Sequence, residues 1–372
     1  MNKKKILTII LIILFIGFVA ERINTNKSDV YEEQNKISIK KNKNMLSMNL
    51  EQTAGAGDYK TVTQSSWPTE GYEFNTELSR CEKGSELSWD DTKKAVIMQG
   101  NVSDKCYVYF DLIPSMTLAE YVISQYTGVQ GENGIYYHNS SLENGAGDNS
   151  YRYAGASNNV NNYICLGSDA TTCPDANLFR IIGVFGDQKK VIRAKSVGDQ
   201  KWNTSKANAW SSSSLNTYLN GEYLTNLGTL ADKIATTTWK VGGGSSTYLY
   251  DVPTTAYQYE VGSSASTTTY EAKIGLMYAS DYGFAASSSA WTTKLSSYSS
   301  NTSKNWLYLG SYEWTISRYS GGTTGAFVVG GSGGVGSDAV TSSCAARPSF
   351  NLESSVKYVS GSGTIENPIR IN

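Results

Sequence analysis

The feature that most constrains the fold is a pair of apolar runs separated by a short polar turn. The runs are Asn177–Phe185 and Lys190–Ala194, and Gly186 to Lys189 lie between them. Two segments rich in Ile, Val and Phe that flank such a turn are typical of a β-hairpin. We therefore predict a central hairpin, around which the larger domain of the chain is built.

The N-terminus has the pattern of an export signal. Lys3–Lys5 precede a predominantly apolar run, Ile6–Ala20, as in a signal peptide or signal anchor. The run would span about 22 Å as a helix at ~1.5 Å per residue. This is shorter than a bilayer core of ~30 Å and favours cleavage. Two features favour an uncleaved anchor. A cut after Ala20 would place Phe18 where signal peptidase prefers a small residue, and the charged Glu21–Arg22 follow at once. Both alternatives for residues 1–20 export the rest of the chain.

The chain beyond this segment divides by composition. Residues 21–44 are polar and have no sustained apolar period, so we predict a flexible linker. A small β module is predicted at 45–113, a connecting helix at 114–133 and the larger domain at 134–372. The formal net charge is −1, so no basic field indicates a nucleic-acid partner.

Five cysteines bear on the compartment and on the fold. In an exported chain, two close pairs are read most simply as the disulfides Cys81–Cys106 and Cys165–Cys173. The first would staple a module that is small for an independent core. Neither pair has zinc-site spacing, and His138 is the single histidine. Cys344 is expected to be buried and unreactive.

Short strand-like segments predominate, and two helices stand out among them. Thr117-Leu-Ala-Glu120 is a capping box that predicts a helix start. Leu215, Tyr218, Leu219 and Tyr223 recur on one face of a second helix. The predicted fold class is therefore α+β and strand-dominated, with a disulfide-stapled β-sandwich-like module before the larger domain.

Four segments in one order carry a resemblance to a known family. They are Phe179–Gly183, Trp210–Glu222, Trp314–Arg318, and Ala346–Phe350 before the Gly361–Thr364 turn. In this order the chain resembles a bacterial family of unknown function, whose domain is related to C-type lectin-like folds and to sulfatase-modifying factors. The resemblance implies a C-type lectin-like C-terminal domain at the bacterial cell surface. The calcium-chelating Glu-Pro-Asn and Trp-Asn-Asp motifs of sugar-binding lectins are absent from the sequence.

Motifs for catalysis are weak. Gly331–Gly336 matches G-x-G-x-x-G, but no helical period follows it, so we predict a turn rather than a cofactor loop. His138 has no nucleophile-elbow motif nearby. The carboxylates available for glycoside hydrolysis show no spacing that singles out a pair; they are Asp251, Glu260, Glu271, Asp281 and Glu313. We predict no catalytic residue, no cofactor and no metal.

Tyrosine and tryptophan alternate with Ser, Gly and Asn between residues 239 and 345, a composition typical of recognition loops. The densest cluster is predicted to bind the ligand, with burial in the core as the alternative; it comprises Trp306, Tyr308, Tyr312, Trp314, Arg318 and Tyr319.

The leading hypothesis is a bacterial surface protein, anchored through its N-terminal segment or secreted, that binds a glycan, wall polymer or protein without catalysis. The alternatives are an extracellular polysaccharide-acting enzyme with unidentified carboxylates and a structural surface or appendage subunit.

Overall fold

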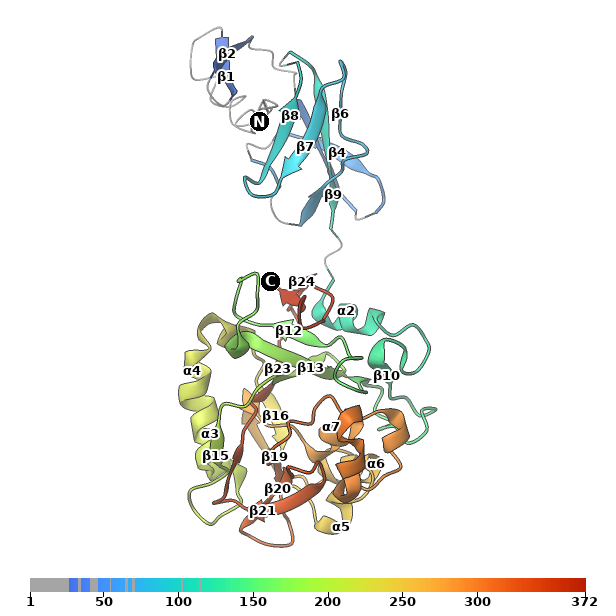
Figure 1. Cartoon of the computed structure of the whole chain (residues 1–372), viewed down its shortest axis with the longest axis vertical. Coiled ribbons are helices and arrows are strands. Elements are labelled where there is room, and N and C mark those ends of the chain that lie inside the picture. Colours follow the sequence, from blue (N-terminus) through green and yellow to red (C-terminus); the bar gives the residue numbers. More distant parts are fainter. Residues whose placement is uncertain are drawn as a thin grey trace. The chain divides into compact units, whose positions relative to one another are not determined.

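The computed structural model describes residues 27–32, 35–40, 46–53, 55–63, 66–68, 71–101, 103–113 and 116–372. The chain divides into two compact units, residues 1–115 and 116–372 (Figure 1). The predicted signal or anchor at residues 1–20 lies outside the described ranges. Within those ranges, no helix has the length and apolar character needed to cross a membrane.

Two strands occur in the segment predicted to be a linker. β1 (Lys27–Glu32) and β2 (Asn35–Lys40) pair as an antiparallel hairpin. The sequence predicted no regular structure between residues 21 and 44, so structure and prediction differ here. Ile37 and Ile39 are β-branched residues at alternate positions, which favours a strand, but the surrounding Lys and Asn residues obscured this short signal.

The smaller unit has two layers of strands. The first sheet has the order β4-β3-β9-β5, with β6 also paired with β9, and the second is the β7–β8 hairpin. The bounds are β3 (Leu46–Glu51), β4 (Tyr59–Val62), β5 (Tyr72–Phe74), β6 (Arg80–Cys81), β7 (Glu86–Asp90), β8 (Ala95–Gln99) and β9 (Cys106–Leu112). Phe110 lies at the centre of their shared core, with ring contacts to Trp67, Phe74 and Trp89. The strand-rich prediction for this module is confirmed.

Both predicted disulfides are present. Cys81–Cys106 joins the paired strands β6 and β9, with 4.0 Å between the Cα atoms. Cys165–Cys173 closes a loop in the larger unit, with 5.8 Å between the Cα atoms. Cys344 is a buried free thiol, and burial raises its pKa to about 12, so it is a thiol rather than a thiolate at neutral pH.

The larger unit contains two main sheets and two ribbons. The first sheet has the order β10-β11-β13-β14-β23-β18, with β12 also paired with β13, and the second has the order β15-β22-β19-β20-β21. The first sheet comprises β10 (Ile135–Tyr137), β11 (Tyr151–Tyr153), β12 (Tyr163–Cys165), β13 (Leu178–Phe185), β14 (Gln188–Arg193), β18 (Ile274–Gly275) and β23 (Ser349–Leu352). The second comprises β15 (Asp199–Lys201), β19 (Glu313–Arg318), β20 (Gly325–Val329), β21 (Val335–Ala339) and β22 (Ser343–Ala345). The ribbons pair β16 (Thr237–Lys240) with β17 (Thr269–Ala272), and β24 (Tyr358–Ser360) with β25 (Arg370–Ile371).

The central hairpin is confirmed as β13–β14, with Phe179 opposite Arg193 and Phe185 opposite Gln188. Gly186 begins the turn with φ of +63°, a backbone conformation that glycine adopts without steric cost. β13 also pairs with β11 and β12 and is buried almost throughout, which explains its continuous apolar run.

Helices cover the sheets on two sides (Figure 1). α2 (Leu118–Ser124) begins with the predicted capping box. The predicted second helix is formed by α3 (Ser214–Tyr218), a π-helical turn at Leu219–Tyr223 and α4 (Leu224–Asn226). On the opposite side are α5 (Ser246–Leu249), α6 (Pro253–Glu260) and α7 (Ala279–Phe284). Short 3₁₀ helices lie at Glu132–Gly134, Asp175–Asn177, Trp210–Ser212, Gly228–Lys233, Ser288–Ala290 and Leu295–Lys304.

Gly183 provides a test of the central sheet. A Cβ atom at this position would collide with the carbonyl oxygen of Tyr151 on β11, where the β13–β14 register shifts between Ile181 and Gly183. We expect Gly183→Ala to reduce the free energy of unfolding by roughly 1–3 kcal/mol, as overpacking does. Urea unfolding measures this. Gly336→Ala on β21, where a Cβ atom meets open space, is the control, and equal losses in both variants would contradict the close approach.

Candidate functional site

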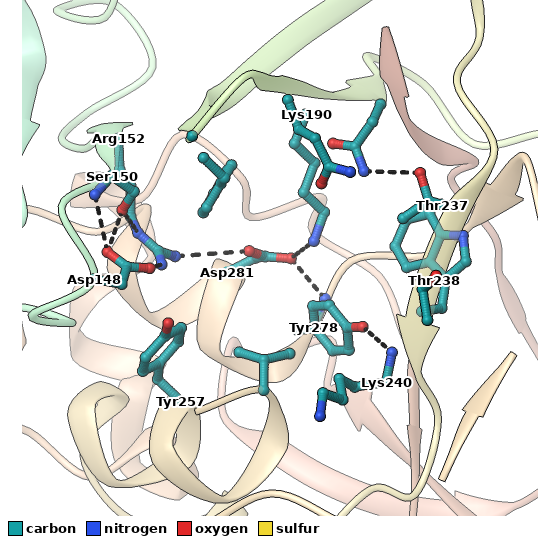
Figure 2. Close-up of a pocket in the computed structure, with 16 residues that line it drawn as sticks. Asp148, Ser150, Arg152, Lys190, Thr237, Thr238, Lys240, Tyr257, Tyr278 and Asp281 are labelled. Carbon is teal, nitrogen blue, oxygen red and sulfur yellow. Dashed lines mark hydrogen bonds and ion pairs between the residues drawn. The ribbon is translucent and has the colours of Figure 1, made fainter. Parts of the chain in front are cut away.

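The larger unit has a pocket with a cavity volume of about 340 Å³, within the range of small-molecule sites. Its lining residues lie on or next to β11, the β13–β14 hairpin, β16, β23, α6 and α7. Figure 2 draws their side chains. The pocket therefore lies where the central hairpin meets a ribbon and two helices.

Asp281 joins two cations in this pocket. Its Oδ2 accepts hydrogen bonds from Lys190 Nζ at 2.5 Å and from the backbone N–H of Tyr278 at 2.8 Å. Its Oδ1 lies 3.8 Å from Arg152 Nη1. Lys190, Arg152 and Asp281 are 6 %, 2 % and 4 % exposed. Because an unpaired buried charge is strongly destabilising, both cations depend on Asp281 for counter-charge.

Asp148 is the second partner of Arg152. Arg152 Nη2 donates to Asp148 Oδ2 at 2.5 Å, and Arg152 Nε donates to Ser150 Oγ at 2.8 Å. Burial opposes ionisation of Asp148, but the charge of Arg152 and the hydrogen bonds from Ser150 outweigh it and lower the pKa to about 2. Asp148 is therefore a carboxylate at neutral pH and holds no proton for general-acid catalysis.

Aromatic rings surround both cations. The Arg152 guanidinium lies 4.5 Å from the ring centroid of Phe185 and 5.2 Å from that of Tyr257. Lys190 Nζ lies 4.3 Å from the ring centroid of Tyr278 and 5.4 Å from that of Trp239. Burial lowers the pKa of Lys190, and the charge of Asp281 opposes this effect. Cation–π attraction helps to hold charge in walls of this kind.

Positive charges outnumber negative charges around the cavity. Three cations line it, Arg152, Lys190 and Lys240, against two carboxylates, Asp148 and Asp281. Both carboxylates already accept hydrogen bonds from the protein. Lys240 Nζ has no hydrogen-bond or ion-pair partner within the described ranges, and Lys190 Nζ uses one of its three donors. The pocket is therefore complementary to a ligand group that is negatively charged or rich in acceptors.

Two of the predicted ligand-binding residues are core residues. Trp306 and Trp314 are 3 % and 0 % exposed, and their indole N–H groups donate to the carbonyl oxygens of Tyr153 and Gln200, both at 2.8 Å. β19, which carries Trp314, pairs with strands on both sides and is buried along its length up to Arg318. The prediction that these two rings contact a ligand is corrected accordingly.

The other four predicted residues also lie away from the pocket. Tyr308 donates to the carbonyl oxygen of Gly331 at 2.6 Å, and Arg318 Nε donates to that of Gly242 at 3.0 Å. The Tyr319 ring packs against Phe327, with 5.9 Å between the centroids. Tyr312 is 57 % exposed. The six residues lie near one another along the chain, but none of them lines the pocket described here.

Asp281 alone among the five candidate carboxylates lines this pocket. Glu313 is 1 % exposed and accepts two hydrogen bonds from Arg347, at 2.6 and 2.8 Å. Glu260 accepts from the backbone N–H groups of Ala279 and Ser280, both at 2.9 Å. Burial raises the pKa of Glu313 and of Glu260, although these hydrogen bonds oppose the rise. Asp251 and Glu271 line no part of the cavity.

The glycine-rich motif and His138 are both accounted for by the fold. Gly331–Gly336 spans the connection from β20 into β21, so a strand follows the glycines. His138 is fully buried, and its Nδ1 accepts the N–H of Ala146 at 3.0 Å. No group of three or more His, Cys, Asp or Glu side chains in the described ranges is arranged to hold a metal ion.

Sequence reasoning missed the residues that form the pocket, although a signal was present. Lys190 stands two positions before Ile192 on a strand, so the two share a face, and Ile192 is in the core. Arg152 gives no such signal, because its neighbours Tyr151 and Tyr153 on β11 face the opposite side of the strand. A cation at a core-facing strand position requires a buried partner, but Asp281 is too distant in sequence to be identified as that partner.

Comparisons with protein-family models, with curated proteins and with solved structures found no match.

The charge network predicts the effect of removing its centre. Asp281→Asn would leave Lys190 and Arg152 without their shared counter-charge, and we expect a loss of roughly 3–5 kcal/mol in the free energy of unfolding. Asp175→Asn is the matched control because Asp175 pairs with Lys195 at 2.5 Å on the exposed surface, where a pair contributes about 0–1 kcal/mol. Thermal and urea unfolding of both variants check this. Similar small losses would mean that Asp281 is not the counter-charge that this geometry implies.

Proposed function

We propose that residues 116–372 form a non-catalytic ligand-binding domain of an exported surface protein, and that the ligand enters the pocket lined by Arg152, Lys190 and Lys240. The observation that carries this proposal is the surplus of positive charge in the pocket. The pocket carboxylates are already bound to protein groups, whereas Lys240 Nζ has no hydrogen-bond or ion-pair partner within the described ranges. A concave site with uncommitted charge is suited to recognition.

The side chains that line the pocket limit the classes of ligand that can bind. Phe185 and Tyr257 provide partly exposed aromatic surface, and Lys240 with Thr238 provides polar groups at the rim. A cavity of about 340 Å³ admits the end or a side group of a polymer rather than a flat protein surface. The negative charge that complements this pocket is present in an acidic unit of a glycan, of a wall polymer or of an exposed protein segment.

Location outside the membrane is part of the same proposal. The basic and apolar N-terminal segment indicates export, and the two disulfides suit an oxidising compartment. The resemblance to anchored bacterial proteins with a C-type lectin-like domain agrees with attachment through residues 1–20 and with ligand recognition by the larger unit.

An extracellular polysaccharide-acting enzyme is the alternative. Asp148 and Asp281 do lie in one pocket, as a pair of catalytic carboxylates would. Both are held by Arg152, however, and Arg152 keeps Asp148 ionised, with its pKa at about 2. This arrangement supports positioning of cations rather than proton donation to a leaving group.

Thr238→Trp tests the proposed site. Thr238 is an exposed residue of β16 that lines the pocket, so a large ring there should fill the entrance without disturbing the core. We expect calorimetric titration of the full chain to show saturable binding of an acidic glycan or wall-polymer fragment, and at least a tenfold loss with Thr238→Trp.

Thr236→Trp is the matched control, because Thr236 is exposed and does not line the pocket. Undiminished binding by Thr238→Trp would place the ligand elsewhere. A folded chain that binds no member of a panel of acidic glycans, wall-polymer fragments and short peptides would overturn the proposal, and turnover of a polysaccharide would favour the enzyme.

A further inference from the structure

No strand in the described part of the chain pairs with the edge of β16 that faces the pocket. β16 pairs only with β17. Val241 N–H donates to the carbonyl oxygen of Thr268 at 3.0 Å just beyond the ribbon. Hydrogen-bonded pairs alternate along an antiparallel ladder, and the register therefore makes Trp239 and Thr237 the residues bonded to β17. Thr238 and Lys240 direct their backbone groups away from it.

That direction leads into the pocket. Lys240 N–H donates to the hydroxyl oxygen of Tyr278 at 2.9 Å, and Tyr278 lines the cavity (Figure 2). All four residues of β16 line the cavity as well, as expected of a strand that presents its edge rather than one face. The N–H and C=O of Thr238 and the C=O of Lys240 have no hydrogen-bond partner within the described ranges.

Two cations lie at the same cavity. Lys240 follows Thr238 by two residues, and Lys190 Nζ is held between Asp281 and the Tyr278 ring. The strand edge supplies one donor and two acceptors at the spacing of an extended backbone, and the lysines supply positive charge. A chain that pairs with the edge and ends in a carboxylate is complementary to both features.

We propose that the pocket binds the C-terminal end of an extended peptide, whose backbone amides pair with the Thr238 edge and whose terminal carboxylate is held by Lys240. Strand addition with capture of a terminal carboxylate is a general mode of peptide recognition. β16 has four residues, so pairing extends over about two ligand residues at ~3.3 Å each. This inference rests on the proposed function, since it names the ligand of the same pocket.

Calorimetric titrations of the full chain with four small probes separate the contribution of the ligand carboxylate from that of its backbone amide. The probes are N-acetyl-Ala-Ala with a free carboxylate, its C-terminal amide, the free acid N-methylated at its last peptide nitrogen, and glucuronate, an acidic sugar without an amide. We expect saturable binding of the free acid. The C-terminal amide and the N-methylated peptide should each bind at least tenfold more weakly, because one loses the charge and the other loses a backbone donor.

Lys240→Ala should weaken binding of the free acid at least fivefold and leave binding of the C-terminal amide unchanged. Lys206→Ala, which removes an exposed lysine that does not line the pocket, should change neither. Such coupling between one lysine and one ligand group identifies their direct interaction.

Each of three outcomes would overturn the peptide inference, the proposed function or both. Equal binding of the acid, the amide and the N-methylated peptide would overturn strand pairing with carboxylate capture. Binding of glucuronate without any peptide binding would overturn the peptide inference and leave the proposed function standing. Absence of binding to every probe and to the wider glycan and wall-polymer panel, by a chain that unfolds cooperatively, would overturn both.

Discussion

The pocket depends on the pairing of Asp281 with Lys190 and Arg152. The three side chains come from α7, β14 and β11, so one carboxylate links a helix to two strands of the central sheet. None of the three is more than 6 % exposed. The cost of an unpaired charge in such surroundings exceeds most single packing contacts. The helix must therefore dock where Asp281 meets both cations, and this fixes the wall between α7 and the hairpin.

The same pairing also determines which groups remain available for a ligand. Asp281 and Asp148 are occupied by protein donors, so neither can hold a ligand cation without losing a buried partner. Lys190 retains donors after binding Asp281, because an ammonium has three, and Lys240 is uncommitted. Pairing of the carboxylates with protein donors thus leaves the remaining charge of the pocket positive.

Local and non-local determinants explain which features could be predicted from the sequence. The β13–β14 hairpin, the Thr117 capping box and the Cys165–Cys173 disulfide follow from residues that are close along the chain, and all three are present. The aromatic cluster at Trp306–Tyr319 has the composition of a surface loop. The burial of Trp314, however, is decided by β20 and β22, which pair with its strand. The pocket joins Arg152 with Asp281, and no local pattern connects these residues.

The edge of β16 that faces the pocket has no paired strand within the described ranges, and its position in the pocket limits which chains can pair with it. An exposed strand edge is a template for unwanted pairing with other chains, and proteins commonly protect such edges with charge. Here the edge lines a cavity of about 340 Å³, and Lys240 and Lys190 contribute positive charge to the same walls. A long neutral strand would need space along the full edge and would leave those lysines without counter-charge. The peptide end that we propose as ligand is short and carries a carboxylate, so it would meet neither obstacle.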